Sequence, residues 1–420
     1  MPDRDFLKTP EDKLGLNYGY VVLVASFIIM SVAVMGMGIY SIFFKPMSVE
    51  FGWTRSVTSG PYTLAFLMFG TLSAVTGRLT DKFGPRSVVT ICGLVFGLGI
   101  FLMSRVDSIW LLYIYWGLLV GIGRSGNMVP PLSTIARWFH KRRGIMTGIA
   151  MAGVGVGNLI IPPVATRLIE AYGWRDAFVI LAVVTVVIMV LAAQFLRRPR
   201  AAVARAGPDL SPMPGATPPD ISGLSLQETL RNRQFWLLSS FYLIHMMITQ
   251  AIMVHLVPHI TDLGISAVTA ATILAISGGM SSVGRVVNGA VSDGAGTRVA
   301  MITVGVTTFI AFLGLGMVEE VWLFYLFGVI YGFCWGSGAA TMSPLIAQNF
   351  GLRAHGTIMG IMIMLSTIGG ACGPLMAGGL FDATGNYTMT FIILDVLAGV
   401  VLLLSFFIRG QRATVLRSVG

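Results

Sequence analysis

Long apolar stretches, separated by short polar segments, follow one another along almost the whole chain. A helix that crosses the hydrocarbon core of a bilayer needs about 20 apolar residues. Stretches of that length predict twelve membrane-spanning helices, with ends uncertain by about three residues. They lie near 18–44, 58–79, 86–105, 109–136, 145–168, 176–196, 234–257, 267–290, 298–318, 321–347, 356–380 and 388–409. The pattern therefore predicts an all-α membrane protein of six helices, a polar linker and six more helices.

The second half of the chain repeats the first at a constant offset of 212 residues, as from Gly77 to Gly289. The decapeptide GRLTDKFGPR at 77–86 recurs as GAVSDGAGTR at 289–298. The same offset pairs Gly144 with Gly356. One ungapped register indicates a duplicated unit, and membrane carriers bind substrate between two such halves.

The duplication predicts three regions. They are an N-terminal six-helix half at 1–196, a cytoplasmic linker at 197–233 and a C-terminal six-helix half at 234–420. The linker is rich in Pro, Ala and Gly, which is typical of a flexible tether. We expect its Arg residues to contact lipid headgroups.

Charge fixes the expected orientation. The chain is 55% hydrophobic and 11% charged, whereas a soluble domain carries about 25% charged residues. The net charge of +10 comes from Lys and Arg at alternate helix ends, which is the positive-inside pattern of membrane proteins and not a nucleic-acid footprint. We expect both termini in the cytoplasm, no removable signal peptide, and residence in a plasma membrane, that is, a bacterial inner membrane.

Metal, cofactor and enzyme chemistry find no support in the residue pattern. Cys92, Cys334 and Cys372 lie inside apolar spans without CxxC spacing, so we expect free, buried thiols. No nucleophile–base set stands out. A membrane sensor would need a folded soluble domain, for which the linker and tails are too short.

The repeated decapeptide is a candidate gate. Asp81 and Arg86 recur as Asp293 and Arg298, and an acidic group there caps a helix start and pairs with Arg. The alternative is a plain loop with topology charges. The pattern resembles the helix 2–3 loop signature of the major facilitator superfamily. Because the second copy has Gly294 in place of a basic residue, we expect a weaker latch there.

Two further segments resemble a narrower family. The run WFHKRRGIMTGIAMAG at 138–153 resembles the helix 5 signature of monocarboxylate transporters, and NYGY at 17–20 resembles a degenerate form of their other signature. Its small residues favour close helix packing. The resemblance spans the whole chain and also fits the bacterial oxalate/formate exchangers.

Arg285 and Arg124 are charged residues deep within predicted helices. A charge at that depth costs at least about 2.5 kcal/mol and marks a substrate or ion path. Arg285 resembles the helix 8 Arg that contacts the substrate carboxylate in monocarboxylate and oxalate transporters, and a guanidinium makes a two-point match to a carboxylate. The alternative for Arg285 is a structural ion pair, for example with Asp395. Arg124 is either a second anion contact or a structural cation.

Uncharged residues near the two Arg complete the expected site. The substrate-binding candidates are Arg285, Arg124, Asn127, Tyr331, Trp335, Ser281 and Asn288. The two aromatic residues suit helix packing as well as a cavity wall. His245, in the seventh helix, is the candidate for proton coupling, with a satisfied core histidine as the alternative.

Departures from the family put the familiar proton-coupling pair in doubt. Proton-coupled members carry an Asp before the helix 8 Arg and a Lys in helix 1, where this chain has Ser281 and, approximately, Gly38. The Lys that exchangers carry in helix 11 is missing from 356–381.

We expect a secondary active carrier of small monocarboxylates such as lactate or pyruvate. Its partners would be the substrate, protons and membrane lipids, with no nucleic acid and no cofactor. Proton symport by alternating access is the first hypothesis, and carboxylate exchange of the oxalate/formate type is the second. Nitrate or another inorganic anion stays open as a substrate, because two buried Arg residues suit it.

Overall fold

A computed structural model describes residues 10–36, 39–53, 55–139, 142–199, 223–313, 315–318 and 320–409. Gly38, most of the predicted linker and both chain ends lie outside the described residues. The first half contains α1 (Pro10–Val32), η2 (Ala33–Gly36), α2 (Tyr40–Phe51), α3 (Arg55–Phe83), α4 (Pro85–Leu102), η3 (Met103–Arg105), α5 (Ile109–Leu112), η4 (Tyr113–Val120), α6 (Gly121–Ser125), α7 (Val129–Trp138) and α8 (Arg143–Gln194). The second half contains α10 (Leu226–Leu230), α11 (Arg233–Asp262), α12 (Ala267–Gly294), α13 (Thr297–Phe312), η5 (Leu315–Met317), α14 (Val321–Phe350), α15 (His355–Thr384) and α16 (Thr388–Phe407).

These helices confirm the predicted twelve-span fold. Nine helices within the described ranges are long and apolar enough to cross a membrane. One of them, α8, holds two predicted spans, because Gly173 bends the backbone with φ of 81°. The 28-residue α12 and the shorter, apolar α13 supply the remaining spans.

Two spans are less regular than predicted. The first is interrupted by the 3-10 turn η2 between α1 and α2. The fourth contains the π-helical turns of η4, the short α6 and a break at Gly126–Met128 before α7. Pro130 and Pro131 open α7, where a missing backbone N–H is tolerated. π-helical turns often mark functional sites.

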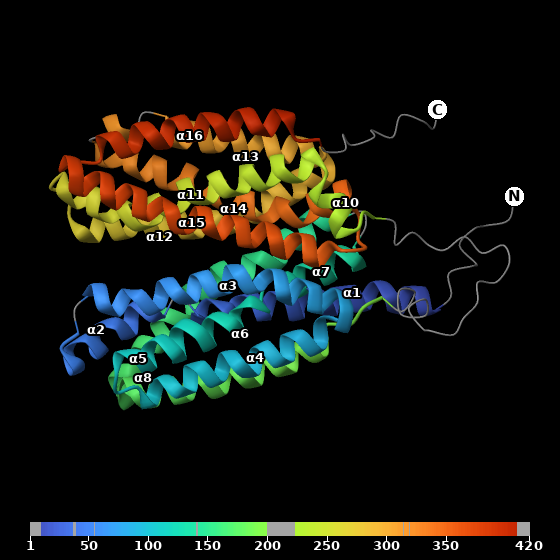
Figure 1. Cartoon of the computed structure of the whole chain (residues 1–420), viewed down its shortest axis with the longest axis horizontal. Helices are drawn as coiled ribbons and strands as arrows, with labels where there is room; N and C mark the ends of the chain where they lie inside the picture. Colours follow the sequence, from blue (N-terminus) through green and yellow to red (C-terminus); the bar gives the residue numbers. More distant parts are fainter. Residues whose placement is uncertain are drawn as a thin grey trace, which may run out of the picture.

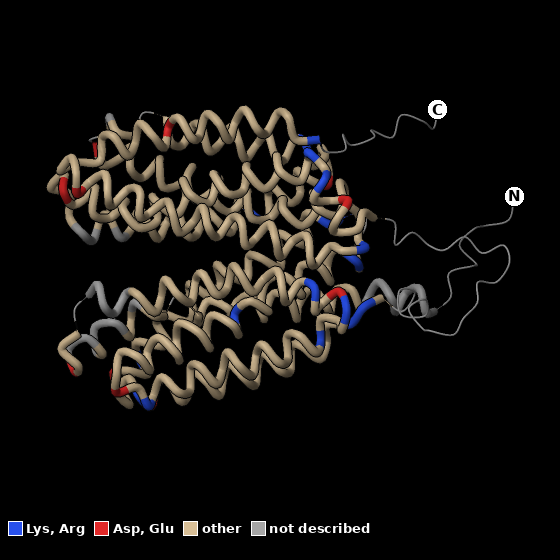
Figure 2. The backbone as a smooth tube through the Cα atoms, viewed as in Figure 1, with Lys and Arg blue, Asp and Glu red and all other residues tan. Residues whose placement is uncertain are grey.

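The helices form two bundles that lie side by side (Figure 1). Lys and Arg gather at the end of the molecule where α1 begins and α16 ends, and most Asp and Glu lie at the opposite end (Figure 2). We call these the basic end and the opposite end. The bundles meet mainly through α3 against α15 and α8 against α12.

Glycines bring these helix pairs into close contact. A Cβ added at Gly77 would lie 2.1 Å from the Gly356 carbonyl oxygen, and one at Gly144 would lie 2.3 Å from that of Gly289. One added at Gly148 would lie 2.3 Å from the Arg285 carbonyl oxygen. No side chain fits at such distances, so glycine is required for the halves to approach.

The cysteine expectation needs one correction. Cys92 and Cys334 are buried free thiols, as predicted, but Cys372 is exposed. Apolarity of a span does not determine burial, because the outward face of a membrane helix is as apolar as its core.

Candidate functional site

Arg285 lies on α12, two turns before Asp293, and is only 4% exposed. Its guanidinium lies over the Trp335 ring of α14, 5.6 Å from the centroid. Nε and Nη1 have no hydrogen-bond partner among the described residues. A buried guanidinium of this kind is open to an anionic ligand, because an unpaired buried charge is costly.

Arg124 lies on α6, between the π-helical turns of η4 and the break that precedes α7. Its guanidinium lies 4.6 Å from the centroid of the Phe69 ring on α3, and its Nη1 is buried without a partner. Asn127, in the break itself, is 1% exposed with both polar side-chain atoms unpartnered. The irregular backbone thus places two polar groups with free hydrogen-bonding capacity deep in the first half.

A cavity of about 80 Å³ lies between the halves. Its lining comes from the first half at Phe66, Phe69 and Met128, and from the second half at Tyr242, His245, Met246, Trp335, Gly338, Ala339, Met342, Ile363, Ser366 and Thr367. The lining includes Phe69 and Trp335, the two aromatic residues over whose rings the guanidinium groups of Arg124 and Arg285 lie. The two Arg residues therefore flank one cavity from opposite halves.

His245 on α11 lines this cavity and is 4% exposed. Its Nδ1 lies 3.4 Å from the Thr308 hydroxyl, and its Nε2 has no partner. The absence of a side chain at Gly338 leaves room for the ring, because a Cβ there would lie 2.5 Å from Nε2. His245 is thus a buried imidazole on the cavity wall with one unpartnered ring nitrogen.

Trp335 is the one substrate-binding candidate in the described lining of the cavity. The lining does not include Arg285, Arg124 or Asn127, nor does it include Ser281, Asn288 and Tyr331. Ser281 donates to the Gly278 carbonyl, and Asn288 donates to the carbonyls of Ala300 and Ser337 while its Oδ1 stays unpartnered. Tyr331 is fully buried, donates to the Thr249 carbonyl at 2.7 Å and stacks on Phe327. Their role in substrate binding stays a prediction.

Asp81 joins the two halves at the basic end, and we call this contact the first latch. Its carboxylate accepts hydrogen bonds from the backbone N–H groups of Gly356 and Thr357, at 3.2 and 2.8 Å, and from the Thr357 hydroxyl. It thereby caps the start of α15 in the other half, where backbone N–H groups lack helical partners. Arg137 adds an ion pair to Asp81 at 2.8 Å.

Asp293 forms a second latch with the same backbone geometry. Its carboxylate accepts from the N–H groups of Gly144 and Ile145, both at 2.7 Å, and so caps the start of α8. The two carboxylates and their partners are related by the 212-residue offset. Each half therefore reaches across to a helix start in the other.

Sequence reasoning named the carboxylates but not their cationic partners. Arg86 is exposed with no hydrogen bond to a described residue, and Arg298 donates to the Phe406 carbonyl. The observed partners are Arg137, and Arg198, which donates to the backbone carbonyls of Thr80 and Asp81. In the sequence both belong to the Lys and Arg residues at helix ends that follow the positive-inside pattern. The signal that singles out Arg137 is a departure from the repeat, because Asn349 stands at its equivalent position.

Known proteins provide an independent comparison. The sequence matches the family model of the Major Facilitator Superfamily over residues 26–321 and 289–418. It is 28% identical to monocarboxylate transporter 13 of Bos taurus over 395 residues, covering 90% of this chain and 86% of that protein. It is also 28% identical to monocarboxylate transporter 11 of Mus musculus, covering 90% and 84%.

Solved structures show the same fold. The proton:xylose symporter XylE bound to 6-bromo-6-deoxy-D-glucose superposes with a TM-score of 0.72 at 13% identity, covering 94% of this chain and 97% of that one. The transporter FucP in the outward conformation gives 0.69 at 14% identity, covering 93% and 99%. The chain is thus a multi-pass membrane protein that belongs to the Major Facilitator Superfamily, and within it resembles the monocarboxylate transporters.

Proposed function

We propose that this protein is a carrier, and not an enzyme, that moves small monocarboxylates such as lactate or pyruvate across the membrane. The observation that carries the proposal is the pair of Arg residues on opposite halves, of which Arg285 is buried and Arg124 half-buried. Each stacks on an aromatic ring of the same cavity and keeps N–H groups without partners. A planar guanidinium matches the two oxygens of a carboxylate.

The similarity to monocarboxylate transporters favours this substrate class over oxalate or formate exchange. A largely apolar cavity also suits the short hydrocarbon part of such acids. Transport would proceed by rocking of the two halves about the cavity. The latches of Asp81 and Asp293 would hold the basic end shut in one state and release it in the other.

The charge asymmetry supports an orientation. By the positive-inside rule the basic end faces the cytoplasm, and with it both chain ends and the linker. The membrane would be the plasma membrane, which in a bacterium is the inner membrane. In this state the latches close the cytoplasmic side.

Proton coupling through His245 is part of the proposal. No carboxylate precedes Arg285 by one turn, where Ser281 stands, so the proton needs another carrier. His245 lines the same cavity, and its Nε2 has no partner among the described residues. An imidazole ring nitrogen can accept and release a proton, which suits this role.

The test of the substrate site is uptake of a radiolabelled acid panel into proteoliposomes containing Arg285→Lys protein. We expect uptake to fall at least tenfold, because Lys keeps the charge but loses the two-point geometry. The matched control is Arg105→Lys, at an exposed position, which should behave as wild type. Wild-type uptake by folded Arg285→Lys protein would reject a direct carboxylate contact.

A second measurement separates symport from exchange. Proton flux per substrate is recorded in wild-type and His245→Gln vesicles. We expect the variant to move substrate with fewer protons. An unchanged ratio would make His245 a packing residue, and counterflow without proton movement in wild type would establish exchange.

A further inference from the structure

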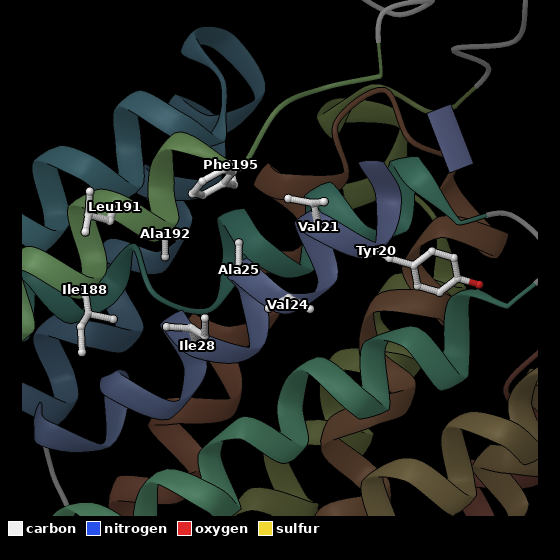
Figure 3. A pocket seen from close by; sticks show the side chains of 9 residues that line it. All are labelled: Tyr20, Val21, Val24, Ala25, Ile28, Ile188, Leu191, Ala192 and Phe195. Carbon is white, nitrogen blue, oxygen red and sulfur yellow. The ribbon is translucent and has the colours of Figure 1, made fainter. Parts of the chain in front are cut away.

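An apolar groove of about 570 Å³ runs along the outer surface of the first half, between α1 and the end of α8 (Figure 3). Its floor is formed by Ala25 and Ala192, which are 3% and 6% exposed. Its walls include Val24 and Leu191, which are 57% and 59% exposed. It extends from Tyr20 to Ile28 along α1, or about 12 Å at 1.5 Å per residue.

The floor of the groove and one wall position carry small side chains where the other half carries large ones. At the 212-residue offset, Ala25 corresponds to Leu237 and Ala192 to Leu404. Val24 corresponds to Trp236, whose indole N–H donates to the Leu230 carbonyl. The duplicated helix pair α11 and α16 therefore has the equivalent place occupied by its own side chains.

A cation stands at the basic end of the groove. Phe195 lines the groove there, and its carbonyl accepts a hydrogen bond from the Tyr18 hydroxyl at 3.1 Å. The Arg197 guanidinium lies 5.8 Å from the centroid of the Tyr18 ring. Arg197 is exposed and makes no ion pair with a described residue. The Trp138 indole donates to the Arg197 carbonyl at 2.7 Å and holds its backbone in place.

We propose that this groove binds a phospholipid with an anionic headgroup, one acyl chain lying between α1 and α8 and the phosphate beside Arg197. The groove is apolar along its length of about 12 Å, and the cation with its aromatic neighbours stands at its basic end, where headgroups lie. A zwitterionic lipid fills the groove equally well but leaves Arg197 partly uncompensated. The site is independent of the transport proposal, because none of its residues borders the cavity between the halves.

The test is native mass spectrometry of the purified full chain in a nonionic detergent. Phosphatidylglycerol and phosphatidylcholine with identical acyl chains are added in equal amounts. We expect wild type to retain more phosphatidylglycerol. Arg197→Gln should lower that preference about fivefold, which is the contribution of one cation near an anionic headgroup to the binding constant. The variant should still bind lipid.

Two variants provide the matched comparison. Val24→Trp introduces the residue that the second half has at the equivalent position. The larger side chain should fill the groove and reduce retention of both lipids. Because Val24 is exposed, the change should not disturb packing within the protein. Arg409→Gln removes the equivalent cation of the second half and should leave the preference unchanged. Thermal melting shows that each variant is folded.

The results decide between occupants. Unchanged preference in Arg197→Gln, unchanged retention in Val24→Trp, or an equal loss in Arg409→Gln each overturns the site. A wild-type dimer that Val24→Trp dissociates would make the groove a subunit interface instead. As a second readout, a photoactivatable phosphatidylglycerol should label α1 and α8 in wild type but not in Val24→Trp, and labelling elsewhere only would contradict the proposal.

Discussion

The two latches at the basic end share one backbone geometry but differ in side-chain support. Asp81 receives two backbone hydrogen bonds, a hydroxyl hydrogen bond and an ion pair with Arg137. Asp293 receives two backbone hydrogen bonds and the longer-range attraction of Arg143 and Arg142, with no ion pair among the described residues. Duplication thus preserved the part of the latch made by the backbone and let the side-chain part diverge.

The physical cause of the difference is one residue. Asn349 stands at the position equivalent to Arg137, and its amide donates to the Leu345 carbonyl within α14. The two loops also differ at Lys82, where the second copy has Gly294. This difference does not strengthen the first latch, because the Lys82 ammonium lies over the Phe83 ring and not beside Asp81. The strength of a latch is therefore determined by its neighbouring helix and not by its own loop.

Asp81→Asn should have the largest effect on closure. The change leaves Arg137 and the α15 start without their carboxylate, at a cost of about 2–4 kcal/mol for charge-assisted hydrogen bonds. We expect the basic end to open at least tenfold more often. The measurement is the alkylation rate of Ser73→Cys, a buried position facing Gly360, in a chain whose three native cysteines are replaced.

The control for this prediction is Asp293→Asn in the same background. It should raise the alkylation rate in the same direction but by less, since no ion pair is lost. Equal rates for the two variants would show that the ion pair contributes nothing to closure.

Gly148→Ala and Gly360→Ala should have intermediate and equal effects. Their added Cβ atoms would lie 2.3 and 2.2 Å from the carbonyl oxygens of Arg285 and Ser73. Overpacking of this kind costs about 1–3 kcal/mol, and it must push the halves apart. Gly278→Ala is the control, because its Cβ would meet nothing within 4 Å. Thermal stability and substrate uptake report the change, and a large difference between the two variants would contradict the mirrored geometry.

Arg137→Asn should remove the ion pair from the first latch and leave it with the same kind of backbone hydrogen bonds as the second latch. Because the ion pair is partly exposed, with side-chain exposures of 16% and 14%, we expect a cost of about 1 kcal/mol. A double-mutant cycle with Asp81→Asn, read by the same alkylation rate, isolates the pair. Additive effects would mean that Arg137 acts without Asp81.

We expect the smallest effect on stability from a substitution at the opposite end of the molecule. There, the Glu50 carboxylate accepts hydrogen bonds from Arg175 and Trp174. These hydrogen bonds lower the pKa of the Glu50 carboxyl, led by that from Arg175. The ionised Glu50 carboxylate therefore stabilises the fold at pH values above the ordinary pKa of Glu. This stabilisation is lost as the pH falls through the lowered pKa of Glu50 in the folded protein. Glu50→Gln should cost at most about 1 kcal/mol at neutral pH and nothing in acid. Melting temperatures against pH test this, and a difference that persists in acid would exclude the ionised pair as its cause.

Most of the fold could be predicted from the sequence, because bilayer thickness imposes span lengths that hydropathy detects. The breaks in the first and fourth spans could not. They depend on contacts between helices, as where Gly36 packs against the Arg124 side chain, and these contacts leave no periodic signal.

The candidate site was predicted in part. The cost of burying charge singled out Arg124 and Arg285, and the search for a titratable group found His245. Tyr331 is a sequence-based candidate for substrate binding because it lies one helical turn from Trp335. In the structure its hydroxyl donates a hydrogen bond to the Thr249 carbonyl in its own half. Helical spacing indicates a shared face, whereas the neighbour on that face depends on tertiary packing.

The glycine contacts described above have the form of an isologous interface. Gly77 meets Gly356 as Gly289 meets Gly144, and Ser73 meets Gly360 as Arg285 meets Gly148. Such reciprocity is what two-fold symmetry produces in a dimer of identical subunits. The contact surface between the halves therefore has the symmetry of an isologous interface, and Arg285 is the point at which one half places a charge where the other has the hydroxyl of Ser73.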